Sequence, residues 1–290
     1  MRKVTLAHRV EYALLMFVIF ILRLMPLHVA SAFMGWIWRS IAPRLRRQKR
    51  AMAHLRLAFP DKSDSELHAI TLRMWENLGR TFAESVLADR FVARMDELIT
   101  EPKNYREVVE EIKKSGGVIV SLHSGNWELG GAISSHNGFD CSVVMQKLKN
   151  PLVHDYMIRK RAETFSGGVF VKGDRAGMKA LTSVHGGKAV AIMGDLRDVR
   201  GSSIDFFGRP APTNTFPARL ARKKGAPLIG LRIRRIRDIH FEVQAEIIPM
   251  PQTDDIEDDI LKATLAEQTQ FEAWIRQAPD QWMWAHRRWG

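Results

Sequence analysis

From about residue 103, short β-branched runs alternate with longer amphipathic segments, and this alternation limits the fold more than any other feature of the chain. The pattern is typical of an α/β domain in which helices flank a mainly parallel central sheet. We expect strands at 118–121, 142–145, 169–171, 189–193, 227–232 and 241–248, and helices at 105–114, 126–135, 151–164, 174–185, 215–224 and 256–278. Only residues 234–239 separate the last two strands, which predicts an antiparallel hairpin at the edge of the sheet.

The preceding segment, residues 51–98, is predicted to be helical. Pro60 ends one helix, and Ser63 with Glu66 forms a capping box at the start of the next. Apolar residues then recur at helical spacing to about Ala88, most of them expected in the core. We therefore divide the chain into residues 1–50, described next, and residues 51–290, a helical lead-in followed by the α/β domain.

The N-terminal segment has an apolar run at 13–22 and a second apolar stretch at 24–38, which Pro26 and His28 interrupt. A signal peptide and a buried core helix are two interpretations. We favour a third, a helical membrane anchor that is either spanning or interfacial. The basic cluster at 39–50 follows at once, and such a cluster beside an apolar segment is typical of a cytoplasmic membrane surface.

Charge and cysteine content narrow the possible partners. The 290-residue chain has 44 Lys and Arg against 32 Asp and Glu, a net charge of +12, and a pI near 10.1. Such a chain is attracted to nucleic acid, anionic membranes, phosphorylated ligands or an acidic carrier protein. Cys141 is the only cysteine, which excludes an intramolecular disulfide and any zinc site with several cysteines.

The candidate active site begins with His123, which follows the strand at 118–121. Residues 124–126 are turn and N-cap types, so a helix should start near Asn126 with Glu128 in its first turn. The turn would let Glu128 meet His123, and a carboxylate beside an imidazole suits a general base that acts on a hydroxyl. The structural alternative is a strand-end histidine and a glutamate favoured by the helix dipole.

Three further segments carry polar or aromatic side chains of interest. Asp195 follows the strand at 189–193 and should lie at the same sheet edge as His123, where it could orient a substrate or a basic partner, or only form an Asx turn. Arg159 and Arg161 could bind phosphate or simply complement a helix C-terminus. The loop at 205–215, with two Phe, could line an acyl tunnel or pack as an ordinary loop.

The closing segment, residues 279–290, interleaves aromatic and basic residues, which suits a membrane interface, cation–π contacts or single-stranded nucleic acid. The sequence has no Gly-x-Ser-x-Gly elbow, no P-loop and no His-Glu-x-x-His motif. We expect neither a cofactor nor a metal.

In order and spacing, these segments resemble the late acyltransferases of bacterial lipid A biosynthesis, the lauroyl/myristoyl acyltransferase family of the lysophospholipid-acyltransferase-like superfamily. The resemblance is carried by 54–60, 74–80 with Glu84, 123–128, Arg161, 194–195, 206–208 and 281–289. It implies an acyltransferase-like fold and an inner-membrane enzyme whose catalytic domain faces the cytoplasm. Such enzymes move a fatty acyl group from acyl-acyl carrier protein to a hydroxyl of a Kdo-bearing lipid A precursor.

The resemblance also implies roles for individual residues. His123 and Glu128 correspond to the catalytic pair, with Glu128 holding the imidazole. Arg161 (with Arg159 as the alternative), Asp195, Asn126 and Arg209 are expected to bind substrate. Backbone N–H groups after Gly125 would stabilise the oxyanion. The partners implied are acyl carrier protein, the lipid A precursor and the membrane, and not nucleic acid.

Three other functions remain open on the sequence. The acceptor could be another membrane glycolipid or aminolipid. Water could replace the acceptor, which would give a thioesterase. In a different class, the protein could be a non-enzymatic, basic membrane-surface or nucleic-acid-binding protein, whose binding would weaken steeply with salt.

Overall fold

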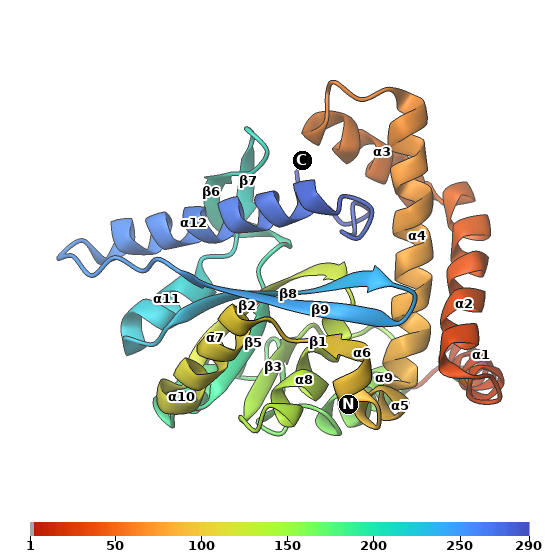
Figure 1. Ribbon diagram of the computed structural model, residues 1–290, viewed down its shortest axis with the longest axis horizontal. Coiled ribbons are helices and arrows are strands. Elements are labelled where there is room, and N and C mark those ends of the chain that lie inside the picture. The colour runs from red at the N-terminus through yellow and green to blue at the C-terminus, as the bar shows by residue number, and fades with distance from the viewer. Residues whose placement is uncertain (1–2, 290) are drawn as a thin grey trace.

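The computed structural model describes residues 3–289 and has a seven-stranded sheet at its centre (Figure 1). The strand order is β1-β9-β8-β2-β5-β3-β4, with bounds β1 Ile99–Thr100, β2 Gly117–Gly125, β3 Cys141–Met145, β4 Gly168–Val171, β5 Ala189–Met193, β8 Leu228–Arg237 and β9 His240–Ile248. All neighbours pair in parallel except β8 and β9, which form the predicted antiparallel hairpin. The predicted α/β fold with a mainly parallel sheet is confirmed.

Helices pack on both faces of the sheet, because alternate side chains of the central strand point to opposite sides. In β2, Ile119 belongs to one apolar core, while Val118, Val120 and Leu122 belong to the other. The first core also takes residues from α7 (Lys103–Ser115), α8 (Gly130–His136) and α9 (Pro151–Ala162). The second takes residues from α10 (Ala176–His185), α11 (Phe216–Lys224) and α12 (Ile256–Gln277).

The helical lead-in stands along one end of this sheet (Figure 1). It comprises α1 Leu6–Arg23, α2 Leu27–Ile41, α3 Arg46–Ala58, α4 Asp64–Val86, α5 Ala88–Val92 and α6 Met95–Leu98. The predicted capping box of Ser63 and Glu66 begins α4. A Cβ at Gly79 would overlap the carbonyl oxygen of Met34, so glycine lets α2 approach α4 closely. The proposed division at residue 50, which lies within α3, stays a prediction.

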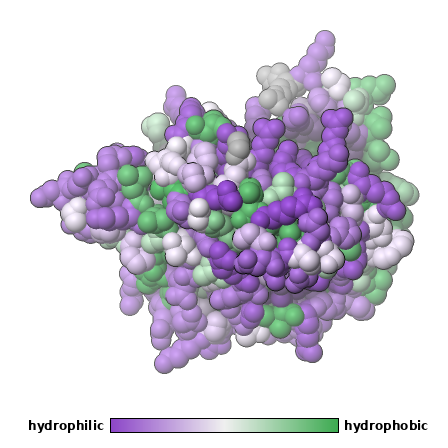
Figure 2. Space-filling model, turned by 90° about the horizontal axis from the view of Figure 1, so that it is seen from above, coloured by the Kyte–Doolittle hydropathy of each residue, from purple (hydrophilic) through white to green (hydrophobic). Residues whose placement is uncertain are grey.

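The outer face of α1 and α2 is apolar and exposed. Among residues 3–289, ten exposed large hydrophobic side chains lie on these helices and the turn between them: Leu6, Val10, Leu14, Phe17, Phe20, Leu24, Val29, Phe33, Trp36 and Ile41. Figure 2 shows hydrophobic residues gathered at the edge of the molecule that these helices occupy in Figure 1. Within residues 3–289, no helix is both long and apolar enough to cross a bilayer, so the spanning form of the predicted anchor is unsupported.

The structure departs from the sequence prediction at three elements. The helix expected from Asn126 begins later, because β2 continues to Gly125 and a 3-10 turn at Trp127–Leu129 precedes α8. The short strand β1 was missed. A second, two-stranded sheet, β6 (Arg197–Asp205) and β7 (Pro210–Thr213), occupies part of the predicted loop. Prolines in β7 hid this hairpin, because proline is uncommon in paired strands.

Candidate active site

His123 and Asp195 meet at the carboxyl edge of the sheet. Strands β2 and β5 are parallel neighbours with Ser121 opposite Met193, so the residues two positions further along also lie side by side. The Nδ1 atom of His123 lies 2.8 Å from Oδ1 of Asp195, and the backbone N–H of His123 donates to Oδ2 at 2.7 Å. The indole N–H of Trp282 donates to the same Oδ2 at 2.8 Å. One buried carboxylate therefore fixes the backbone and the ring of the histidine.

The carboxyl group of Asp195 remains ionised in this setting. Its burial would raise its pKa, but the charge of His123 and the hydrogen bonds from that residue's ring and backbone lower the pKa to about 2. An ionised carboxylate at Nδ1 places the ring proton there and leaves Nε2 free to accept a proton. His123 lines the cavity described below. This is the geometry of a general base.

Glu128 does not hold the imidazole, contrary to the prediction. Its carboxylate accepts two hydrogen bonds from Arg161, at 2.6 Å from Nη2 and 3.1 Å from Nε. The ring of Trp127 lies against the ring of His123, with centroids 5.0 Å apart, and Glu128 projects from the next position of the 3-10 turn. The prediction relied on an α-helix whose first turn would bring the Glu128 carboxylate back toward His123, but residues 127–129 form a 3-10 turn instead. Asp195, which was expected to orient a substrate or a basic partner, takes that position.

Arg161, rather than Arg159, reaches the site, because it is the arginine that pairs with Glu128. Burial opposes its charge, but the charge and hydrogen bonds of Glu128 raise the pKa of its guanidinium. Both side chains are mostly buried and line the same cavity as His123. The pair therefore forms a second charged feature beside the base.

A cavity of about 780 Å³ opens beside His123 and passes into the first apolar core. Most of its lining is hydrophobic, including Ile119, Ile133, Phe139, Val143, Phe165 and Leu231. Besides Arg161, three further cationic side chains line it, namely Lys172, Arg175 and Arg197. Such a cavity can hold a hydrocarbon chain with one polar end at the histidine.

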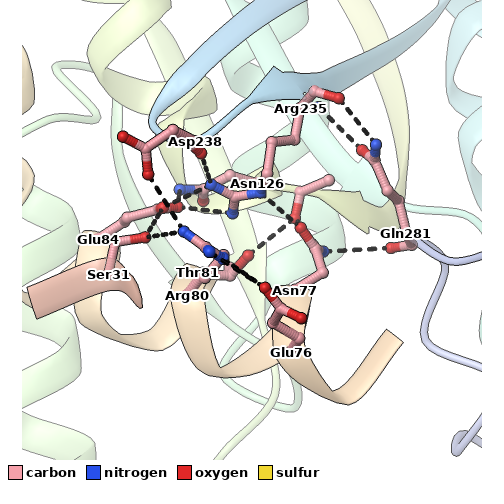
Figure 3. A network of polar contacts seen from close by, with 11 residues as sticks. Ser31, Glu76, Asn77, Arg80, Thr81, Glu84, Asn126, Arg235, Asp238 and Gln281 are labelled. Carbon is pink, nitrogen blue, oxygen red and sulfur yellow. Dashed lines mark hydrogen bonds and ion pairs between the residues drawn. The ribbon is translucent and has the colours of Figure 1, made fainter. Parts of the chain in front are cut away.

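Asn126 is buried in a polar network that joins α2, α4, β8 and the turn after His123 (Figure 3). Its Nδ2 donates to Oε2 of Glu84 at 2.8 Å. Glu84 is fully buried and also accepts two hydrogen bonds from Arg235, at 2.6 and 2.9 Å. Asn126 is therefore placed to position the turn, and it is not among the residues that line the cavity.

The same network holds the carbonyl group of Gly125. Asn77 and Thr81 of α4 donate to this oxygen at 2.9 and 2.8 Å (Figure 3). Gly125 has φ +60°, and a Cβ there would overlap the carbonyl oxygen of Ile233. Only glycine fits this tight turn without strain.

The N–H groups of Gly125 and Asn126 are already hydrogen-bonded, to the carbonyl oxygens of Gln281 and Ile233. Of the N–H groups after Gly125, that of Asn126 is therefore not available to an oxyanion. For Trp127 and Glu128, the proposed oxyanion role stays a prediction.

Two other predicted features lie away from the cavity. The Arg209 side chain is exposed on the turn between β6 and β7 and does not line the cavity. Phe206 and Phe207 are buried against the aromatic rings of Phe59, Trp284 and Trp289. Neither phenylalanine lines the cavity, so the two rings do not form the wall of an acyl tunnel there, although Asn214 of the same predicted loop does line it.

Residues 281–286 of the closing segment form one side of the site, a role that the sequence did not predict. The Met283 N–H donates to the carbonyl oxygen of His123 at 2.9 Å, and Trp282 forms an antiparallel bridge with Ser124. The ring of His286 lies 4.9 Å from the ring of His123, between centroids. The mixture of aromatic and basic residues marked this segment as unusual, but nothing local in it indicated that it pairs with residues 123–125.

Among residues 3–289, no group of three His, Cys, Asp or Glu side chains is arranged to hold a metal ion. Cys141 is buried, and burial raises the pKa of its thiol to about 12, so it is a poor nucleophile. That the reaction uses no cofactor or metal stays a prediction.

Comparison with known proteins agrees with the site. The family model for bacterial lipid A biosynthesis acyltransferases matches residues 2–290. A lipid A biosynthesis lauroyltransferase of Escherichia coli is 28% identical over 250 residues, which cover 84% of this chain and 79% of that protein. A phosphatidylinositol mannoside acyltransferase of Mycobacterium tuberculosis is 30% identical over 120 residues, 39% of this chain and 37% of that one. Because the family model covers nearly the whole chain, the chain belongs to the bacterial lipid A biosynthesis acyltransferase family.

Proposed function

We propose that this protein transfers a fatty acyl group from the thioester of acyl-acyl carrier protein to a hydroxyl group of a Kdo-bearing lipid A precursor. The observation that carries the proposal is the imidazole of His123, which is held by Asp195 at the entrance to a largely apolar cavity. A hydrocarbon chain in the cavity would present its thioester carbon to an acceptor hydroxyl that is hydrogen-bonded to Nε2.

The chemistry needs one base and no covalent enzyme intermediate. Nε2 of His123 takes the proton of the acceptor hydroxyl, while Asp195 stabilises the imidazolium that forms. The oxygen attacks the thioester carbon and gives a tetrahedral oxyanion. When the carbonyl re-forms, the C–S bond breaks, and the thiolate takes the proton back from His123. The products are an ester and the free thiol of the carrier protein.

Charged groups around the cavity support phosphorylated substrates. Lys172, Arg175 and Arg197 line the cavity and have no ion-pair partner within residues 3–289. Both the prosthetic group of a carrier protein and a lipid A precursor carry phosphate, for which such cations are suited. The net charge of +12 would also draw an acidic carrier protein to the surface.

We place the protein at the cytoplasmic face of the inner membrane through α1 and α2. Their exposed apolar face can lie in the lipid interface, while the basic cluster at 39–50 contacts anionic headgroups. Trp36 is 63% exposed on this face, as an interfacial tryptophan should be. The attachment would bring the cavity to the lipid acceptor.

A second candidate acceptor is another membrane glycolipid. The observation in its favour is the similarity to a phosphatidylinositol mannoside acyltransferase. The name of that protein gives an acyltransferase whose lipid differs from lipid A. The base and the cavity would serve either acceptor.

The test is transfer of labelled acyl groups from carrier proteins of several chain lengths to two acceptors, a Kdo-lipid A precursor and a mannosylated phosphatidylinositol. His123→Ala should lower the rate by about 10² to 10⁴-fold. The matched control is His68→Ala, because His68 is an exposed histidine of α4. Transfer only to the second acceptor would replace the proposed substrate, and full activity of His123→Ala would remove the proposed base.

A further inference from the structure

His286 is a second imidazole at the reaction centre, and the mechanism above does not use it. It lines the same cavity as His123, and the two ring centroids are 4.9 Å apart. Its Nε2 atom is buried and has no hydrogen-bond partner among residues 3–289. Buried polar atoms are almost always paired, so an unpaired one beside a catalytic base needs an explanation.

The imidazole of His286 is neutral at physiological pH. Burial is the main cause that lowers its pKa to about 4, and the neighbouring charge of His123 acts in the same direction, against the opposing effect of Asp195. A neutral imidazole keeps one N–H donor and does not compete with His123 for the acceptor proton.

The oxyanion of the reaction needs a hydrogen-bond donor, and two backbone N–H groups of the turn after His123 are not available for this role. The N–H groups of Gly125 and Asn126 are both occupied. Nε and Nη2 of Arg161 both donate hydrogen bonds to Glu128. The acceptor oxygen is expected to lie about 3 Å from Nε2 of His123, and it attacks the thioester carbonyl carbon. The carbonyl group must therefore lie close to His123, and so close to the neighbouring ring of His286.

We propose that His286 is a further catalytic residue, which donates a hydrogen bond to the oxyanion that forms on the thioester carbonyl. The hydrogen bond forms as the C=O electron pair moves to oxygen, and it is released when the C–S bond breaks. His286 itself neither gains nor loses a proton. This inference rests on the proposed acyl transfer.

The closing segment explains how the ring is held in place. The backbone N–H of Met283 donates to the carbonyl oxygen of His123. The backbone N–H of His286 in turn donates to the carbonyl oxygen of Met283 at 3.1 Å. Residues 283–286 thus form one turn. Its first residue is bonded to the backbone of His123, and its last residue places the His286 ring beside the His123 ring. The two imidazoles are fixed relative to one another through three residues of backbone.

The experiment measures thiol release from acyl-acyl carrier protein, with and without lipid acceptor, for His286→Phe, His286→Gln and His286→Gly. Loss of one oxyanion donor should lower kcat by about 10² to 10³-fold in His286→Phe, with little change in the KM for the donor. His286→Gln retains a donor and should lose less. Added imidazole should restore His286→Gly, whereas furan, which matches the ring but has no N–H, should not.

The matched control is His54→Phe. His54 is also a buried histidine against the closing segment, where its Nδ1 contacts the carbonyl oxygen of Trp284, but it does not line the cavity. It should retain kcat within a few-fold. Activity of His286→Phe within threefold of wild type, or equal rescue of His286→Gly by furan, would overturn the inference. A wild-type protein that releases no thiol would instead overturn the proposed function, and the inference with it.

Discussion

The imidazole Nδ1 of His123 and the carboxylate Oδ1 of Asp195 lie 2.8 Å apart, although 72 positions separate the two residues in the chain. The same carboxylate receives the backbone N–H of His123 and the indole N–H of Trp282. Asp195 therefore sets the ring's orientation and its tautomer at once. Activity should depend on its charge and not only on its shape.

Asp195→Asn is expected to fold and to lower kcat by roughly 10³ to 10⁴-fold, because an amide can stabilise the wrong tautomer and cannot stabilise an imidazolium. Initial rates of acyl transfer measure this. Asp140→Asn is the control, since Asp140 precedes β3 at the opposite end of the sheet and pairs with Lys188. A loss of less than tenfold in Asp195→Asn would show that the contact is structural.

Glu128→Gln should behave differently from Asp195→Asn. The substitution removes the negative charge of Glu128 and leaves the mostly buried guanidinium of Arg161 without a carboxylate partner. We therefore expect a raised KM and a fall in kcat of about tenfold to 100-fold. The acidic limb of the pH–rate profile should remain that of wild type, because Glu128 does not contact the imidazole ring. A shifted acidic limb would restore the predicted pairing of Glu128 with His123.

The bidentate pair of Glu84 and Arg235 is expected to be a major contributor to local stability. Removing one partner of a buried ion pair costs about 3–5 kcal/mol, because the other charge stays uncompensated. Urea unfolding of Glu84→Gln, Arg235→Met and the double variant forms a cycle. The double variant should be less destabilised than the sum of the single variants, and strict additivity would contradict the coupling.

The stability of the protein should fall as the pH rises toward 8, because of Glu267. Burial raises the pKa of this carboxyl group from 4.5 to about 8, while the hydrogen bond from Gln268 and the charge of Arg288 oppose the rise. Between these values the folded protein binds the proton and the unfolded chain does not, so the stabilisation present below about pH 4.5 is lost by about pH 8. Glu267→Gln should remove roughly 3 kcal/mol of this dependence.

Thermal unfolding at pH 5, 6.5 and 8 would measure the effect. Glu246→Gln serves as the comparison, because Glu246 is an exposed glutamate of β9. If Glu267→Gln and wild type lose the same Tm between pH 5 and 8, the buried carboxyl group is ionised in the folded state and the prediction is wrong.

Membrane attachment through the outer face of α1 should be sensitive to one charge. Leu14 is 61% exposed, and Leu14→Asp would put a carboxylate in the lipid interface. Binding to vesicles that contain anionic lipid, measured by flotation, should fall about tenfold or more. Val199→Asp is the control, because Val199 is 73% exposed on β6, away from α1 and α2. Equal binding of both variants would remove α1 from the interface.

The sequence predicted those parts that depend on local pattern. The strand ends at His123 and Asp195 were predicted because each follows an apolar β-branched run, and parallel pairing then brings them to one edge. The partner of His123 was not predicted, because spacing along the chain favoured Glu128, whereas the partner comes from a neighbouring strand. The Glu84–Arg235 pair and the contact of His286 were out of reach for the same reason: each joins residues more than 150 positions apart.

The pairing of residues 281–286 with the turn after His123 has a consequence for the timing of synthesis. His123, Asp195 and five of the seven strands, β1 to β5, precede residue 196, whereas β8, β9, Trp282 and His286 follow it. A nascent chain on the ribosome therefore lacks part of the cavity lining, including Leu231 and His286, until these later residues have been synthesised. Catalytic competence arrives with the final stretch of the polypeptide, after the lipid-facing helices have had the whole of translation to find their surface.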